Sequence, residues 1–277
     1  MDPSGPGTCR NCGTQLHGEF CHECGQSSVI VRRPVRELMH DTLGNLLQWD
    51  TRLIHTLGKL FFKPGRLSLD WLEGKRMRYT PPFRLYIVAS FILFLLFGFS
   101  INQGSSGLDS VKVGQDSLAE IDKALQEAKE AGEWLTSILL QASLEALENP
   151  AAYVQKIVSN LPKAAFLLLP LFALLHMLVD IRQGRYLVDY LIFSLHYHAF
   201  AFILVACIVL TGLISKTAGG VAQILNLAIP VYGVLAFKRF SGQGWVKSTT
   251  KAMLVFFAYS TVLSIGLIFF FAAVLLL

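Results

Sequence analysis

Long runs of apolar residues predict that most of this chain crosses a membrane. After Arg84, seventeen residues up to Ile101 carry no formal charge. A helix needs about 20 apolar residues to cross a bilayer, so this stretch completes a transmembrane helix. Counted in the same way, the sequence predicts five spans, at residues 83–101, 161–179, 188–212, 218–237 and 252–277. Pro162 and Pro170 predict a kink or a tilt in the second span.

The segment before the first span shows an amphipathic pattern instead of a continuous apolar run. From Val35 to Phe62, apolar residues recur at three- and four-residue steps and predict an amphipathic helix. This helix could lie flat in the headgroup region or pack on the membrane domain; the flanking basic residues favour the membrane surface. Pro64 and Gly65 end it, and a short helix follows from Leu67 to Glu73. We expect lipid phosphates to contact four basic residues, Lys75, Arg76, Arg78 and Arg84.

The 102–160 segment, between the first two spans, is acidic and is predicted to lie outside the membrane. It opens with a Gly/Ser-rich stretch, Gly104 to Gly107, followed by a capping pattern at Ser117 and Glu120. A helical stripe then continues to Asn149, so we expect one long amphipathic helix. It could fold onto the outer ends of the spans or pair with a second copy of the chain, and packing on the spans is the plainer account.

Composition and charge agree with a membrane protein and set its orientation. Apolar residues make up 53% of the 277 residues, charged residues 16%, and the mean hydropathy is +0.50. With the N-terminus inside, the inner segments hold 18 of the 24 Lys and Arg residues. Positive residues stay on the cytoplasmic side, so we expect a cytoplasmic N-terminus and an extracytoplasmic C-terminus. The first apolar run long enough to insert starts near residue 83, so no cleavable signal peptide is expected.

Four cysteines near the N-terminus predict a structural metal site. They form two Cys-x-x-Cys pairs, each followed by glycine: Cys9, Cys12, Cys21 and Cys24. Two such turns can place four thiolates around one zinc ion, and four thiolates leave no open position for catalysis. His22 is an alternative ligand, although an exposed position suits it better. So short a segment buries little surface, which makes metal binding its main source of folding energy.

Ionisable residues within the spans are the second candidate site. They are His176, Asp189, His196 and His198, with Asp180 as a further partner. Asp189 and His196 are seven residues apart and share a helix face, whereas His196 and His198 point in nearly opposite directions. Interhelical hydrogen bonds that fix the bundle are the simplest interpretation, and a proton or substrate path is the alternative. Three histidines and two aspartates are too few ligands for a diiron or zinc enzyme.

Three motifs together resemble a known family. They are the two cysteine pairs ending in Cys24-Gly25-Gln26, the Leu-Glu-Gly-Lys-Arg-x-x-Tyr-x-x-Pro segment from Leu72 to Pro82, and His-x-His-x-Phe from His196 to Phe200. This order resembles a bacterial family catalogued as a domain of unknown function, number 3667. The resemblance implies a bacterial inner-membrane protein with a cytosolic zinc ribbon and no established activity.

The sequence therefore predicts an all-α polytopic membrane protein with a small four-cysteine zinc ribbon. Its expected parts are the ribbon (1–30), an amphipathic interfacial segment (31–82) and the membrane domain (83–277). A non-enzymatic adaptor that docks a protein partner through its ribbon is the first hypothesis. A transporter or channel component is the second, and an intramembrane enzyme ranks last because no catalytic motif is present. The ribbon core has one arginine against Glu19 and Glu23, so nucleic acid is not an expected partner, whereas a homo-oligomer is compatible with the sequence.

Overall fold

Helices make up nearly all of the chain that the structure describes. This computed structural model describes residues 7–28, 51–108 and 115–276. The α-helices are α2 (Arg52–Phe62), α3 (Arg66–Leu72), α4 (Pro82–Leu108), α5 (Gln115–Glu130), α6 (Trp134–Glu148), α7 (Pro150–Val179), α8 (Leu187–Ile214), α9 (Lys216–Ala222), α10 (Ala228–Ser241) and α11 (Trp245–Leu276). Short 3-10 helices cover Ile181–Gln183 and Gln223–Leu227. The N-terminal segment, residues 7–28, contains two isolated β-bridges.

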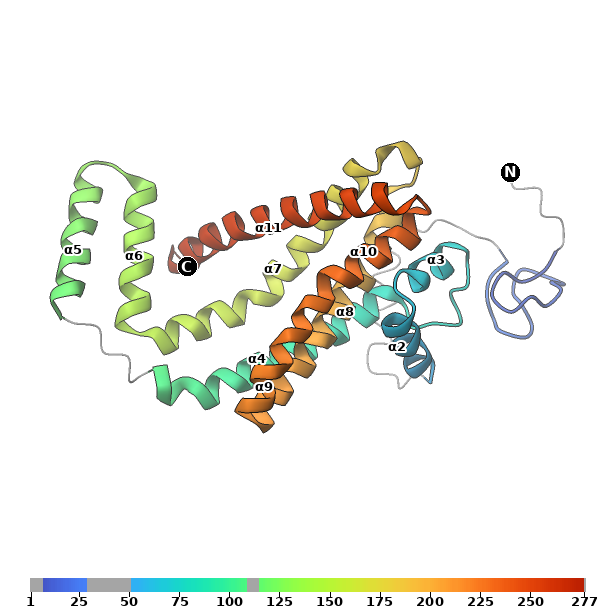
Figure 1. Ribbon diagram of the computed structural model, residues 1–277, viewed down its shortest axis with the longest axis horizontal. Coiled ribbons are helices and arrows are strands. Elements are labelled where there is room, and N and C mark those ends of the chain that lie inside the picture. Colours follow the sequence, from blue (N-terminus) through green and yellow to red (C-terminus); the bar gives the residue numbers. More distant parts are fainter. Residues whose placement is uncertain (1–6, 29–50, 109–114, 277) are drawn as a thin grey trace.

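Five helical segments of the described chain are long and apolar enough to cross a membrane, as predicted. They are Pro82–Ile101, Pro150–Val179, Leu187–Ile214, Thr217–Ser241 and Trp245–Gly266. The most extensive contact in the bundle is between α4 and α8. Figure 1 shows α2, α3 and the N-terminal segment at one end of the spans, with α5 and α6 at the other. The chain is therefore an integral membrane protein with small helical elements at both ends of its spans.

Two helices extend beyond the spans that the sequence predicts. The Gly/Ser-rich stretch from Gly104 to Gly107 continues α4 instead of starting a loop. The second span belongs to a longer helix that starts at Pro150, where proline is favourable at the first helical position. Asn149 caps this helix, because its Oδ1 accepts a hydrogen bond from the Ala152 N–H at 3.2 Å.

The prediction of one long helix outside the membrane is wrong. The chain turns back between α5 and α6, which pack against each other as a hairpin. Gly132 occupies the turn with φ of 71°, a left-handed conformation that glycine adopts without strain. A single glycine within an amphipathic pattern therefore ended the helix. The second helix of the hairpin, α6, also contacts α7 and α11.

The fourth span combines three helical pieces, α9, a 3-10 helix and α10. It follows α8 through a sharp reversal at Ser215, which has an extended backbone. The two arms of this reversal approach closely at Gly212 and Gly219. A Cβ atom on Gly219 would lie 2.4 Å from the Cα of Gly212, so only glycine fits there. The absence of side chains at both positions therefore lets α8 and α9 pack closely.

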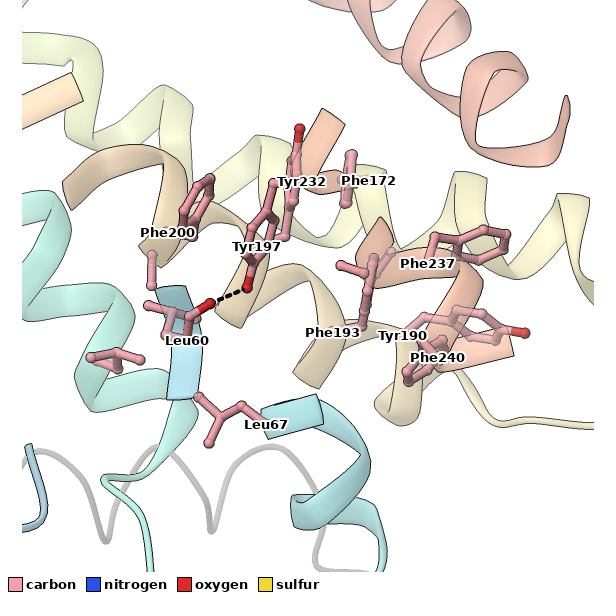
Figure 2. Close-up of a cluster of buried hydrophobic side chains, with 14 of the residues drawn as sticks. Leu60, Leu67, Phe172, Tyr190, Phe193, Tyr197, Phe200, Tyr232, Phe237 and Phe240 are labelled. Atoms are coloured by element: carbon pink, nitrogen blue, oxygen red, sulfur yellow. Dashed lines mark hydrogen bonds between the residues drawn. The ribbon is translucent and has the colours of Figure 1, made fainter. Parts of the chain in front are cut away.

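An aromatic core joins the spans to α2 and α3 (Figure 2). The rings of Phe172 and Tyr197 stack at 5.0 Å, and those of Phe200 and Tyr232 at 3.7 Å. Leu60 from α2 and Leu67 from α3 are fully buried in the same cluster. The described part of the amphipathic segment therefore packs on the membrane domain; residues 35–50 lie outside the described residues.

Backbone contacts fix the α2–α3 corner on α10. Tyr232 donates its hydroxyl hydrogen to the Leu60 carbonyl at 2.8 Å, and Arg239 donates to the Pro64 carbonyl at 2.7 Å. Gly65 has φ of 74°, and a Cβ atom there would lie 2.3 Å from the Ala236 carbonyl oxygen. The Pro64-Gly65 pair is therefore both the helix break that the sequence predicts and a point where the corner closely approaches α10.

Candidate metal centre and its contacts with the membrane domain

The two cysteine pairs lie in matching tight turns. In the first turn, Gly13 N–H donates to the Cys9 carbonyl at 2.7 Å; in the second, Gly25 N–H donates to the Cys21 carbonyl at 2.8 Å. Both glycines have positive φ, 84° and 71°, so a side chain at either position would strain the turn. The isolated bridges Thr8↔Gln15 and Phe20↔Ser27 close the two turns. We call residues 7–28 the ribbon.

The four thiols converge on one point and fit a metal ion. All four Sγ atoms, from Cys9, Cys12, Cys21 and Cys24, lie within 4.8 Å of one another. The Sγ atoms of Cys9 and Cys24 are 3.6 Å apart, and those of Cys12 and Cys21 are 3.5 Å apart. A tetrahedral ion with bonds of about 2.3 Å to sulfur requires sulfur–sulfur separations of roughly 3.8 Å. A disulfide would require about 2.05 Å, so the geometry is that of a metal site.

Two side chains dock the ribbon on the loop between α3 and α4. Gln26 donates its side-chain N–H to the Gly74 carbonyl at 2.6 Å. The Oε1 atom of Gln26 accepts from the backbone N–H of Arg76 at 3.1 Å and of Met77 at 3.3 Å. Asn11 Oδ1 accepts from the Arg78 N–H at 3.1 Å. We call residues 74–78 the docking loop.

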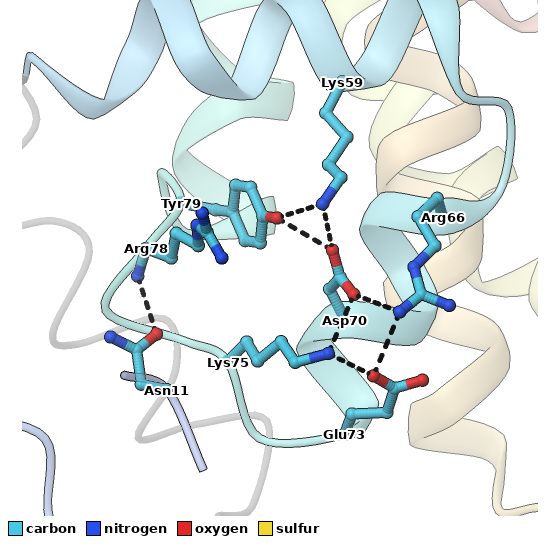
Figure 3. A network of polar contacts seen from close by, with 8 residues as sticks. All are labelled: Asn11, Lys59, Arg66, Asp70, Glu73, Lys75, Arg78 and Tyr79. Carbon is cyan, nitrogen blue, oxygen red and sulfur yellow. Dashed lines mark hydrogen bonds and ion pairs between the residues drawn. The ribbon is translucent and has the colours of Figure 1, made fainter. Parts of the chain in front are cut away.

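Beside the docking loop, Asp70 gathers three cations and a tyrosine (Figure 3). The Lys59 ammonium lies 2.5 Å from one carboxylate oxygen, which also accepts the Tyr79 hydroxyl hydrogen at 2.8 Å. Arg66 and Lys75 approach the other oxygen at 3.0 and 3.3 Å. The Asp70 side chain is only 1% exposed. We call these five residues the Asp70 cluster; they tie α2, α3 and the docking loop together.

The pKa of Asp70 reflects this surrounding charge. Burial raises the pKa of the carboxyl group, but hydrogen bonds from Lys59 and Tyr79, with the charges of Lys59 and Arg66, outweigh it. The pKa therefore falls from 3.8 to about 2. Asp70 is ionised at every physiological pH. Its chemistry is that of a fixed anion that holds cations in place.

The four basic residues expected to meet lipid occupy different surroundings. Lys75 pairs with Asp70 and lies 2.6 Å from Glu73. Arg76 and Arg78 belong to the docking loop, where their backbone N–H groups donate to the ribbon. Arg84 lies in the first turn of α4, at the start of the first span. Lys75 thus has protein partners that the sequence did not reveal.

The intramembrane histidines point toward different helices. His196 Nδ1 lies 2.9 Å from the Ser68 hydroxyl on α3. His198 Nε2 lies 3.1 Å from the Tyr259 hydroxyl on α11. The divergence expected from their two-residue spacing is present, and each histidine ties α8 to a different element. His196 in particular binds the bundle to the α2–α3 corner.

The other two polar candidates occupy separate environments. His176 contacts the ring of Phe172 at 4.6 Å, and its buried Nδ1 has no hydrogen-bond partner. His198 contacts the same phenylalanine ring at 5.0 Å. Asp189 lies in the first turn of α8, where its carboxylate accepts the Tyr186 N–H at 3.0 Å. The structure therefore brings His176 and His198 near one ring and places Asp189 at the helix end as a cap.

Asp180 directly follows α7, and the sequence suggested it only as a partner for Asp189. It is fully buried and lies 2.6 Å from the Lys251 ammonium. Gln243 and Tyr190 also donate to its carboxylate, at 3.0 and 3.1 Å. Asp180 thus connects α7 to α8 and α11. The long separation between Asp180 and Lys251 in sequence gave no signal of this contact.

Two further residues that sequence reasoning missed are Gln26 and Asp70. Gln26 appeared only as the end of a motif, yet its side chain carries the ribbon contacts. Asp70 had one local signal, the four-residue spacing from Arg66 that allows an ion pair on one helix. Its remaining partners come from α2, the docking loop and Tyr79 directly after that loop, and no periodicity reports such contacts.

Comparison with known proteins identifies the segment that contains the cluster. A family model described as "Protein of unknown function (DUF3667)" matches residues 50–94. The match starts before α2 and ends within α4, and it confirms for this segment the resemblance suggested by the motifs. No curated protein and no solved structure matches the chain. Residues 50–94, with the Asp70 cluster and the docking loop, are therefore similar to this family of unknown function, and we call them the DUF3667 domain.

Proposed function

We propose that this protein is a membrane-anchored adaptor whose ribbon binds zinc and recruits a protein partner at the inner face of a bacterial inner membrane. One observation carries the proposal. Gln26 and Asn11 seat the ribbon on the DUF3667 domain, which is itself packed on the spans. A ribbon held in this way has a defined position relative to the bilayer, which is what a docking module requires.

The assignment of zinc rests on the donor set. Four thiolates in a closed tetrahedral arrangement are typical of structural zinc and leave no position for a substrate. Zinc would contribute folding energy here and no chemistry of its own. Metal analysis of the purified protein should give one zinc ion per chain. The paired substitution Cys9→Ser and Cys12→Ser should remove it.

Part of the ribbon surface remains exposed beside these contacts. Phe20 is 66% exposed, although it is among the few large apolar side chains of the ribbon. The imidazoles of His17 and His22 stack at 5.8 Å, and Glu23 is exposed close by in sequence. Single exposed aromatic residues often serve as anchors at protein interfaces. Phe20 is accordingly the position at which we expect a partner to bind.

Photo-crosslinking in intact cells tests the recruitment. A photoreactive phenylalanine analogue placed at Phe20 should capture the same protein reproducibly. The Cys9→Ser, Cys12→Ser variant should lose this product while remaining in the membrane. The same analogue at Lys247, which is exposed near the start of α11, serves as a control for proximity. An absence of any reproducible product at Phe20 would contradict the adaptor proposal.

Contacts with the bilayer complete the proposed arrangement. Positive residues near the inner ends of the spans favour a cytoplasmic ribbon and an extracytoplasmic C-terminus. Arg76, Arg78 and Arg84 are proposed to meet lipid phosphates at this level, whereas Lys75 serves mainly the Asp70 cluster. Reporter fusions after Gln26 and in the α5–α6 hairpin should report opposite sides of the membrane.

One observation favours the alternative, a transporter or channel component. His176 lines a small cavity between α7, α8, α10 and α11, and its Nδ1 has no hydrogen-bond partner. Buried polar groups of this kind often mark pathways in membrane proteins. His176→Gln would then abolish function while the protein stays folded and inserted. Under the adaptor proposal, the same variant still recruits the partner.

A further inference from the structure

The docking loop offers its backbone to the ribbon. Three successive N–H groups, of Arg76, Met77 and Arg78, donate to ribbon side chains, and the Gly74 carbonyl accepts from Gln26. Gln26 is nearly buried, at 9% exposure. Both the N–H donor and the oxygen acceptor of its side-chain amide therefore bind the docking loop. These four hydrogen bonds form only while Gln26 and Asn11 are held in position.

Metal ligands hold both of these side chains in position. The backbone carbonyl of Gln26 accepts a hydrogen bond from the backbone N–H of Cys21 at 2.8 Å. This bond closes the second cysteine turn at Gln26. Asn11 lies inside the first turn, next to Cys12. The ribbon is too small to fold on buried apolar surface, so these turns depend on a bound metal ion. The contacts with the docking loop consequently depend on it as well.

The docking loop in turn is connected to the rest of the DUF3667 domain. Lys75 joins the Asp70 cluster, and Tyr79, directly after the loop, donates to the Asp70 carboxylate. Arg52 of α2 donates to the Met77 carbonyl at 3.0 Å. The chain of contacts thus runs from the thiolates through Gln26 and the docking loop to a cluster fixed on the spans.

We propose that the four-cysteine site is a metal-dependent latch: metal binding orders the docking loop through Gln26 and Asn11, and loss of the metal frees the docking loop from the ribbon. The latch makes zinc availability a signal that reaches the membrane domain. It does not depend on recruitment of a partner, because every contact involved lies within one chain.

Thermodynamic linkage adds a second consequence. If the metal stabilises the docked loop, the docked loop must strengthen metal binding by the same factor. Gln26 supplies three of the four contacts, so Gln26→Ala should weaken metal binding by about tenfold, within the range usual for coupled sites. Gln26 is not a metal ligand, so a ribbon that folds independently would show no change.

Hydrogen exchange on the full chain in lipid nanodiscs, read at single amides, tests the latch. In the zinc-bound protein, the amides of Arg76, Met77 and Arg78 should be protected, and chelation of zinc should speed their exchange by about tenfold or more. Gln26→Ala should expose Arg76 and Met77 while zinc remains bound. Asn11→Ala should expose Arg78 alone.

Matched variants separate the latch from general damage to the ribbon. Gln15→Ala changes an exposed glutamine of the ribbon and should leave both the exchange pattern and the zinc affinity unchanged. Gln26→Glu keeps the acceptor for Arg76 and Met77 but replaces the donor to Gly74, so these amides should stay protected while zinc binding weakens. This variant keeps the test decisive if Gln26→Ala fails to fold.

Two results would overturn the proposal. One is unchanged exchange at residues 76–78 when zinc is removed from the wild-type protein. The other is a Gln26→Ala variant that matches Gln15→Ala in both exchange and zinc affinity. A failure to capture a partner at Phe20 would contradict the adaptor function and leave these measurements valid, so the two proposals fail separately.

Discussion

Replacing Asp70 by asparagine removes the charge that Lys59, Arg66 and Lys75 share. The depression of the Asp70 pKa from 3.8 to about 2 gives a first magnitude. At about 1.36 kcal/mol per pKa unit, the folded protein favours the ionised form by about 2.4 kcal/mol. Breaking a fully buried ion pair costs about 3–5 kcal/mol. The three cations here are 20–39% exposed, so water partly compensates them and the expected loss is about 2–3 kcal/mol.

Thermal denaturation in detergent or nanodiscs measures this loss. For a chain of this size, about 1 kcal/mol corresponds to roughly 2–4 °C, so Asp70→Asn should lower the Tm by about 5–10 °C. Asp122→Asn is the matched control, because Asp122 is exposed on α5 and its loss should cost less than about 0.5 kcal/mol. If both variants melt within about 1 °C of the wild type, the Asp70 cluster does not hold the DUF3667 domain together.

Three further predictions follow from other contacts. Gly65→Ala forces a Cβ atom into the Ala236 carbonyl, so it should separate the α2–α3 corner from α10 and lower the Tm. Gly58→Ala, which has open space around it, should instead raise stability by about 0.5–1 kcal/mol. Equal effects of the two variants in a melting experiment would contradict this role of Gly65. Ser68→Ala and His196→Leu should show a coupling of about 0.5–1 kcal/mol in a double-mutant cycle, and strictly additive losses would show that their contact contributes nothing. The pKa of Asp70 is lower in the folded chain than in the unfolded chain, so the contribution of Asp70 to stability is complete above about pH 5 and is lost as pH falls from about 4 through 2. The Tm difference between Asp70→Asn and the wild type should therefore be constant from pH 5 to 8 and shrink in acid. A difference that grows in acid would refute the assignment.

The spans were predictable because a bilayer imposes one length and one composition. Uncharged runs such as residues 85–101 have few alternatives in a chain of this hydropathy. The cysteine site was predictable for a similar reason, since two Cys-x-x-Cys-Gly turns favour one arrangement of four thiols. In both cases the information is local in sequence. Gly132 shows the limit of such patterns, because one residue with positive φ turned an expected long helix into a hairpin.

Most of the polar contacts were not predictable, since no regular spacing in the sequence links their residues. Basic residues close to a span suggest lipid contacts, and nothing local shows that Lys75 pairs with Asp70. The amphipathic pattern of α2 likewise fits a membrane surface or a protein surface, and the flanking basic residues favoured the membrane surface. The aromatic core around Leu60 shows that the described part of this segment packs on the membrane domain. Gln26 reaches residues about 50 positions away, which no spacing rule anticipates.

The central claim is that a metal-bound ribbon is seated on the DUF3667 domain. A photoreactive amino acid in place of Met77, whose backbone N–H lies 3.3 Å from Gln26 Oε1, tests it most directly. With zinc bound, mass spectrometry should find Met77 crosslinked to peptides from residues 9–26 of the same chain, and zinc removal should abolish these products. Crosslinks that are missing with zinc bound, or that persist unchanged after its removal, would contradict the account.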